Sequence, residues 1–263
     1  MTRPLHGKCA LITGSARGLG LAVAERLAAD GCGVVLNDIA SEADVESIRA
    51  RIERDHAVQA LYHRADLRHP DQIDALVSEA AAAFGSLDIV INNAVVRHVA
   101  PVETFDPARW DEGLAVNVSA AFHTIRLAVP HMQRLGWGRI VNVSSIYGLR
   151  GAINRVGYVT AKTALIGLTR AVSLETATHG ITCNAVCPGT ADTPIHDATI
   201  NAMMAADLLS RTDAERRFLS TKQPTGRFIT AGDVAALIAF LCGPQGAAIT
   251  GSALPVDGGW SAS

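Results

Sequence analysis

The sequence has few aromatic residues, no long apolar run and no block of like charges. Aromatic side chains make up 5% of the 263 residues, whereas apolar residues of all kinds make up 49%. Small aliphatic side chains must therefore form the core, as in a layered α/β interior. No apolar run approaches the ~20 residues of a membrane helix, and a net charge of −2 argues against nucleic acid or an anionic membrane as a partner.

The cysteines form neither a disulfide framework nor a metal-binding pattern. They are Cys9, Cys32, Cys183, Cys187 and Cys242. Because their number is odd and most lie in apolar stretches, we expect buried thiols in a reducing compartment. Cys183 and Cys187 are four residues apart but have no CxxC companion and no nearby histidine, so we expect no metal site. The opening stretch lacks the pattern of a signal peptide, and the sequence predicts a soluble, cytoplasmic protein.

Short apolar runs alternate with longer amphipathic stretches along the chain. The candidate strands cover residues 9–13, 33–37, 59–63, 87–92, 138–144, 181–186 and 253–257. The candidate helices cover residues 18–29, 42–55, 71–84, 108–132, 157–179 and 231–242. Several strands are continuously apolar, as expected when helices cover both faces of a sheet. The alternation predicts a Rossmann-type, doubly wound parallel α/β sheet in a single domain over residues 1–263.

Residues 190–225 interrupt this pattern with an irregular segment rich in alanine and methionine. A connection of this length inside a compact domain is typical of a functional lid. Two short helical patches with four apolar side chains could close over a ligand: Met203, Met204, Leu208 and Leu209. We therefore predict a substrate lid, with a disordered segment as the alternative.

A glycine-rich turn, TGSARGLG, follows the first strand and opens the first helix. Gly14, Gly18 and Gly20 would let backbone amides approach a pyrophosphate at the helix N-terminus, where the helix dipole favours negative charge. A glycine turn without a ligand is the alternative. The strand-turn-helix context nevertheless indicates dinucleotide binding.

The choice of dinucleotide depends on two residues of opposite charge. Asp38 ends the second strand, eighteen residues after Gly20, where an acid binds the adenosine ribose hydroxyls and repels a 2′-phosphate. Arg17 could instead accept that phosphate. Because Asp38 should lie closer to the hydroxyls, the sequence favours NAD. Asp66, after the third strand, either borders the adenine or caps the next helix.

Tyr158 and Lys162 are four residues apart in a helical pattern and therefore share one helix face. A tyrosine hydroxyl ordinarily titrates near ~10, but a neighbouring ammonium and an oxidised nicotinamide favour the phenolate. Tyr158 could then take a hydroxyl proton as a hydride leaves carbon. Ser145, at the end of the fifth strand, could hydrogen-bond the reacting oxygen.

These motifs, with NNA at 92–94 and PGTADT at 188–193, resemble those of the compact, single-domain short-chain dehydrogenase/reductases over nearly the whole chain. The resemblance implies that Tyr158 is the general acid/base and that Lys162 holds the nicotinamide ribose. It further implies that Asn117 keeps a water for proton relay. The implied cofactor contacts are Gly14, Ser15, Arg17, Gly18, Leu19, Gly20, Asp38, Asp66, Leu67, Asn93, Ala94, Tyr158, Lys162, Pro188, Gly189 and Thr193.

Stretches such as LSTKQPTGRFIT and VDGGWSAS are most similar to bacterial D-3-hydroxybutyrate dehydrogenases. In that group polar side chains hold the substrate carboxylate, and several of those positions differ here. Glutamine is replaced by Arg97 and Thr199, histidine by Tyr147, lysine by Arg155 and a lid tryptophan by Thr190. The implied substrate contacts are Arg97, Ser145, Tyr147, Arg155, Tyr158, Thr190, Thr199 and Trp260.

Two arginines at a pocket mouth suggest an anion, because a guanidinium binds a carboxylate through two hydrogen bonds. For Arg97 a solvated loop position is the alternative. We therefore expect NAD-dependent, reversible oxidation of a small anionic substrate, D-3-hydroxybutyrate or a related 3-hydroxy acid. A polyol, sugar or other carbonyl substrate and a non-catalytic NAD-sensing protein are the alternatives.

Two further expectations follow from the resemblance. It implies a homotetramer that pairs residues 108–132, residues 157–179 and the C-terminal strand. Relatives usually carry glycine where this chain has Val95, so we expect a stiffer turn there, without the conformations that only glycine adopts.

Overall fold

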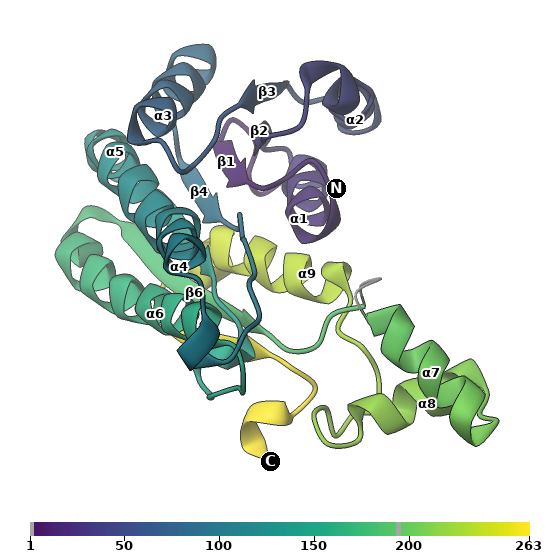
Figure 1. Ribbon diagram of the computed structural model, residues 1–263. Helices are drawn as coiled ribbons and strands as arrows, with labels where there is room; N and C mark the ends of the chain where they lie inside the picture. Colours follow the sequence, from purple (N-terminus) through teal and green to yellow (C-terminus); the bar gives the residue numbers. More distant parts are fainter. Residues whose placement is uncertain (1–2, 193–195) are drawn as a thin grey trace.

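The computed structural model describes residues 3–192 and 196–263. In these residues seven parallel strands form one sheet, in the order β3-β2-β1-β4-β5-β6-β7 (Figure 1). The strands are β1 (Cys9–Thr13), β2 (Gly33–Asp38), β3 (Ala60–Arg64), β4 (Ile89–Asn92), β5 (Gly138–Val143), β6 (Ile181–Pro188) and β7 (Ala253–Val256). The predicted doubly wound parallel sheet is confirmed, and each strand boundary lies within two residues of its prediction.

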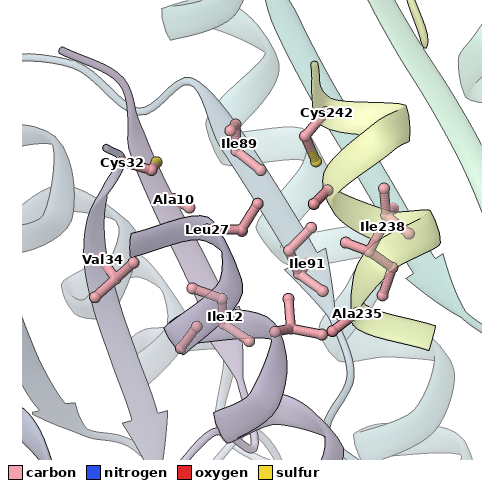
Figure 2. Close-up of a cluster of buried hydrophobic side chains, with 14 of the residues drawn as sticks. Ala10, Ile12, Leu27, Cys32, Val34, Ile89, Ile91, Ala235, Ile238 and Cys242 are labelled. Carbon is pink, nitrogen blue, oxygen red and sulfur yellow. The ribbon is translucent and has the colours of Figure 1, made fainter. Parts of the chain in front are cut away.

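Helices cover both faces of the sheet. They are α1 (Gly18–Ala29), α2 (Glu42–His56), α3 (Pro70–Phe84), α4 (Pro107–Leu114), α5 (Ala120–Leu135), α6 (Val156–Thr176), α7 (Asp197–Asp207), α8 (Arg211–Leu219) and α9 (Ala231–Cys242). Helices α1 and α9 pack together, and α3 packs against α5 (Figure 1). Figure 2 shows Leu27 of α1 and Ile238 of α9 meeting Ile12 and Ile91 of the central strands. The neighbouring Leu11 packs into the other cluster, which explains why these strands are apolar throughout.

The predicted helix over 108–132 is confirmed as a continuous helical stretch, but it is not α-helical throughout. Helix α4 ends at Leu114, a π-helical turn covers Ala115–Ser119, and α5 then runs to Leu135. Such π turns often occur at functional sites. Here the wider turn contains Asn117, whose side chain bonds to the backbone of a neighbouring loop.

Residues 190–225 contain the two predicted helical patches, α7 and α8, which lie together beyond the sheet (Figure 1). Leu208 adopts a left-handed conformation at the end of α7 and is 93% exposed. The expectation that Leu208 belongs to an apolar closing face stays a prediction. Closure of this segment over a ligand stays a prediction. No helix of the described residues combines the length and the apolar character of a membrane span.

Candidate active site

The glycine turn joins the end of β1 to the start of α1. Gly14 and Gly18 have φ angles of 63° and 58°, a region that glycine adopts without steric cost. A Cβ on Gly20 would lie 2.2 Å from the Gly14 carbonyl oxygen and 2.6 Å from Asn93 Nδ2. The first turn of α1 thus packs directly on the loop, and Ser15 is fully buried with its hydroxyl donating to the Ile12 carbonyl at 2.8 Å. This compact cradle at a helix N-terminus fits a pyrophosphate.

Asp38 lies beside the glycine turn at the end of β2. Its carboxylate accepts hydrogen bonds from the backbone N–H groups of Ala16, at 3.3 Å, and Ile39, at 2.8 Å. Arg17, by contrast, is an exposed residue just before α1, and Leu19 is half-buried in its first turn. The acid is therefore fixed at the turn, whereas the arginine extends into solvent.

Asp66 follows β3 and forms an ion pair with Arg68 at 2.5 Å. The Arg68 guanidinium donates hydrogen bonds that hold the pKa of the Asp66 carboxyl below its ordinary value. The cap of α3 is His69, so the helix-capping alternative for Asp66 is wrong. The adjacent Leu67 is buried, and contact of either residue with an adenine stays a prediction.

Asn93 ties the end of β4 to the glycine turn. Its Nδ2 donates hydrogen bonds to the carbonyls of Thr13 and Gly14, both at 2.9 Å. The backbone N–H groups of Asn93 and Ala94 both donate to Thr13 Oγ1, at 2.9 and 3.0 Å. In the described residues the non-glycine positions with positive φ are Ala57, Asn154 and Leu208. Val95 is therefore accommodated without left-handed strain.

A buried chain of hydrogen bonds crosses the sheet behind these residues. Thr124 Oγ1 donates to Asn92 Oδ1 at 2.7 Å, and Asn92 Nδ2 donates to Asn142 Oδ1 at 2.9 Å. Asn142 Nδ2 then donates to Thr169 Oγ1 at 2.9 Å. The sequence interpretation missed three of these residues. The signal that could have identified them is the asparagine inside the apolar run GRIVNVS, because a buried amide needs hydrogen-bond partners.

Tyr158 and Lys162 project from α6 toward the end of β5. Lys162 Nζ lies 5.7 Å from the Tyr158 ring centroid and donates to the Val143 carbonyl at 2.7 Å. Burial, with a contribution from the Arg97 guanidinium, lowers the pKa of Lys162 from 10.5 to about 7. Ser145 directly follows this end of β5, and its Oγ accepts a hydrogen bond from the Tyr147 N–H at 3.2 Å. The structure thus brings the predicted tyrosine, lysine and serine to the same edge of the sheet.

Asn117 anchors the loop that follows β4. Its Oδ1 accepts a hydrogen bond from the Val96 N–H at 2.9 Å, and its Nδ2 donates to the Val96 carbonyl at 3.0 Å. The side chain is 3% exposed, so both its polar atoms serve this loop. A role for Asn117 in holding a water stays a prediction.

Three aromatic rings line the space beside the catalytic candidates. Tyr147 meets Tyr158 edge to face at 6.4 Å between centroids and Trp260 at 5.5 Å. The guanidinium carbon of Arg97 lies 5.4 Å from the Tyr158 ring, and that of Arg155 lies 5.8 Å from the Tyr147 ring. Five of the predicted substrate contacts therefore cluster around the Tyr147 and Tyr158 rings.

The remaining predicted contacts come from the segment after β6. Gly189 donates its N–H to the Val256 carbonyl at 2.9 Å, and a Cβ there would lie 2.5 Å from Gln223 Oε1. This packing explains the glycine after Pro188, which ends β6. Thr190 is largely buried and its N–H also donates to Gln223, whereas Thr199 is exposed on α7. Thr193 lies outside the described residues.

The cysteines are free and buried, as predicted. Burial raises the pKa of the Cys183 thiol to about 12 and that of the Cys187 thiol above its ordinary value. Such thiols are weak nucleophiles at neutral pH. Within residues 3–192 and 196–263 no three histidine, cysteine or acidic side chains come together as a metal site would require.

Comparison with known proteins identifies similar sequences and structures. A sequence profile described as short chain dehydrogenase matches residues 8–204. The D-beta-hydroxybutyrate dehydrogenase of Cupriavidus necator is 39% identical over 98% of this chain and 99% of its own. The cis-4-hydroxycyclohexanecarboxylate dehydrogenase of Sinomonas cyclohexanicum is 38% identical, with 97% of each chain covered. A crystal structure described as a short-chain alcohol dehydrogenase from Sinorhizobium meliloti 1021 superposes over both whole chains with a TM-score of 0.87 and 33% identity.

Proposed function

Because the chain belongs to the short chain dehydrogenase family, and is thus an oxidoreductase of CH–OH donors that uses a nicotinamide cofactor, we propose that its substrate is a small 3-hydroxy acid. D-3-hydroxybutyrate and related acids are the substrates we favour, oxidised reversibly to the ketone with NAD. The observation that carries this proposal is that Tyr158 and Lys162 lie at one site with the guanidinium groups of Arg97 and Arg155.

Tyr158 accepts the proton of the substrate hydroxyl at its phenolic oxygen. Ser145 hydrogen-bonds the same substrate oxygen as its charge changes. The nicotinamide cofactor, when bound, supplies the hydride acceptor. Lys162 is held by the Val143 carbonyl and orients the ribose next to Tyr158. In the reverse direction Tyr158 returns the proton to the carbonyl oxygen.

An anionic substrate fits the positive charge of Arg97 and Arg155 beside the catalytic candidates. Arg97 and Arg155 each lie within 6 Å of an aromatic ring of the site, where a guanidinium can bind a carboxylate. The two dehydrogenases compared above are named for hydroxybutyrate and for hydroxycyclohexanecarboxylate. Each of these compounds has a hydroxyl group and a carboxylate. A polyol or sugar would leave both arginines without a function.

The placement of Asp38 supports NAD as the cofactor. Its carboxylate is fixed at the glycine turn by the N–H groups of Ala16 and Ile39. A 2′-phosphate at the adenosine ribose would meet this charge, whereas two ribose hydroxyls would donate hydrogen bonds to it. The Arg17 side chain is exposed. It would have to move toward a 2′-phosphate before its charge could offset the repulsion from Asp38.

Exposed apolar side chains on three helices support the homotetramer. Phe122 of α5, Leu174 of α6 and Phe240 of α9 are 48%, 81% and 44% exposed, and a second copy of the chain would cover them. Light scattering coupled to gel filtration measures the assembly. The free, buried cysteines fit a reducing, cytoplasmic location.

A screen of hydroxy acids and polyols, followed by the absorbance of the reduced cofactor, tests the proposed reaction. We expect turnover of D-3-hydroxybutyrate or a close relative with NAD, and a loss of about a thousandfold or more in Tyr158→Phe. Turnover of polyols alone would exclude the proposed substrate class. Unchanged activity in Tyr158→Phe would exclude the proposed proton transfer.

A further inference from the structure

Arg97 is presented to the site by a loop that is fixed on both sides. The preceding Val96 is bonded through its N–H and its carbonyl to Asn117, at 2.9 and 3.0 Å. The following His98 pairs with Glu112 of α4 at 2.9 Å. Although the Arg97 side chain is exposed, its backbone is therefore held in place, which reduces the entropy lost when the side chain binds a ligand.

A backbone contact joins this loop to the segment that carries the second arginine. The Ala100 N–H donates to the carbonyl of Asn154 at 3.1 Å, and Asn154 directly precedes Arg155, the first flanking residue of α6. Asn154 has a φ of 60°, in the left-handed region, and α6 begins two residues later at Val156. The two arginines thus extend from two tethered loops to opposite members of the Tyr147–Tyr158 ring pair.

Neither arginine has a carboxylate partner within 4.0 Å among the residues that the structure describes. A further cation, Lys222, lies over the Phe218 ring at 3.8 Å. The pKa of the adjacent His196 is lowered by burial and by the charges of Lys222, Arg97 and Arg155, against which Asp192 acts. Arg97 and Arg155 alone bring two positive charges to the site, more than a single carboxylate neutralises.

We propose that the substrate carries two carboxylates, one on each side of the oxidised carbon, and that Arg97 binds the second one. This proposal rests on the 3-hydroxy acid activity proposed above. Arg155 takes the carboxylate that every 3-hydroxy acid has, and Arg97 takes the carboxylate that the diacid adds. Two such bidentate contacts, from Arg97 over the Tyr158 ring and Arg155 over the Tyr147 ring, would hold the central hydroxyl at the phenolic oxygen of Tyr158.

The reaction on such a diacid is the same two-electron oxidation. The C–H bond at the hydroxyl carbon breaks and its hydride passes to the oxidised nicotinamide. The O–H bond breaks and its proton passes to Tyr158, and the carbon–oxygen bond becomes a ketone. The product is a 3-oxo diacid, with no further co-reactant.

3-Hydroxyglutarate is the test substrate, because it is 3-hydroxybutyrate with a carboxylate added to the methyl end. Its monomethyl ester, supplied as both enantiomers, is the matched control that keeps the size and removes one charge. We expect kcat/KM to be roughly ten- to hundredfold higher for the diacid than for the ester, as one charge-assisted contact provides. In Arg97→Gln this ratio falls toward one, whereas Arg97→Lys retains part of it.

The exposed Arg170 of α6 provides the matched control for net charge. It lies twelve residues after Tyr158, roughly 18 Å along the helix, so Arg170→Gln should keep the ratio. An equal kcat/KM for diacid and ester, with turnover of 3-hydroxybutyrate, would overturn the diacid proposal alone. An equal loss on both substrates in Arg97→Gln would also overturn it. Failure to oxidise any hydroxy acid would overturn both this proposal and the proposed function.

Discussion

The Lys162 ammonium nitrogen lies 2.7 Å from the carbonyl oxygen of Val143 and donates a hydrogen bond to it. The lysine is 2% exposed, and no carboxylate of the described residues pairs with it. A buried ammonium with one carbonyl partner loses more solvation than it regains. The same burial that brings Lys162 to the catalytic tyrosine therefore destabilises its charged form.

We expect Lys162→Met to flatten the pH dependence of the free energy of unfolding. Burial lowers the pKa of folded Lys162 from 10.5 to about 7, so between these values the unfolded chain binds more protons than the folded protein. The stability contributed by this group therefore rises with pH across the window, and its full cost is present below about pH 7. The difference amounts to on the order of a few kcal/mol. Urea unfolding at several pH values within the window measures the free energy of unfolding of the wild type and of Lys162→Met.

The comparison of slopes removes a second effect of this substitution. Methionine leaves the Val143 carbonyl without its donor at every pH, which costs about 1–3 kcal/mol but does not vary with pH. The buried cysteines are common to both proteins and cancel in the difference. Parallel profiles for wild type and Lys162→Met would show that folded Lys162 does not titrate near neutral pH.

The pattern of apolar residues predicted the sheet well, because its strands are short apolar runs that fit few other secondary structures. The boundary of β1, for example, matches over Cys9–Thr13, since the glycine turn ends the strand. The π turn at Ala115–Ser119 was not predictable in this way, because no glycine or proline interrupts the helical pattern there. The turn places Asn117 against Val96, a residue that sequence spacing does not relate to it.

The site was predictable where a motif specifies chemistry and less so where contacts depend on packing. Tyr158 and Lys162 were placed on one helix face by their spacing alone. The buried partners of Asn92, by contrast, come from a strand and a helix that only the fold brings together. Arg97 was recognised as an unusual residue, but its tether to the Arg155 loop through Ala100 depends on tertiary structure.

Gly20→Ala should destabilise the protein and weaken cofactor binding. Its Cβ would lie 2.2 Å from the Gly14 carbonyl oxygen, so the first turn of α1 must move away from the glycine turn. We expect a loss of about 1–3 kcal/mol from overpacking, measured by urea unfolding, and a weaker calorimetric affinity for the nicotinamide cofactor. Gly167→Ala in α6 is the control, because a Cβ there meets no atom within 4 Å and should stabilise by up to about 1 kcal/mol. A Gly20→Ala protein as stable as Gly167→Ala would refute the close contact.

Asn117→Leu should loosen the loop after β4. The substitution leaves the Val96 N–H and carbonyl without their partners at 2.9 and 3.0 Å, at a cost of about 1–3 kcal/mol. We expect faster amide hydrogen exchange at Val96, measured by NMR or mass spectrometry, together with a lower kcat. Gln59→Ala, at an exposed position just before β3, is the control and should change neither. A lower kcat without faster exchange at Val96 would mean that Asn117 acts on the reaction directly and does not work through the loop.

Asp38→Asn should raise the use of NADP relative to NAD. The Ala16 and Ile39 N–H groups donate to different oxygens of Asp38. Asparagine therefore keeps one of these two hydrogen bonds and loses the other while the negative charge is removed. Without that charge a 2′-phosphate is no longer repelled, and we expect the NADP-to-NAD ratio of kcat/KM to rise by roughly tenfold or more. Initial rates with both cofactors on the preferred hydroxy acid measure this ratio.

Two further variants separate the local effect of Asp38 from the net charge of the protein. Asp55→Asn removes an exposed carboxylate at the end of α2 and should leave the NADP-to-NAD ratio unchanged. Adding Arg17→Ala to Asp38→Asn should reverse part of the rise in the NADP-to-NAD ratio. The double variant lacks the guanidinium that could bind the 2′-phosphate. A wild-type enzyme that already prefers NADP would be incompatible with the role given to Asp38. The same conclusion would follow if Asp38→Asn left the ratio unchanged while NAD turnover stayed intact.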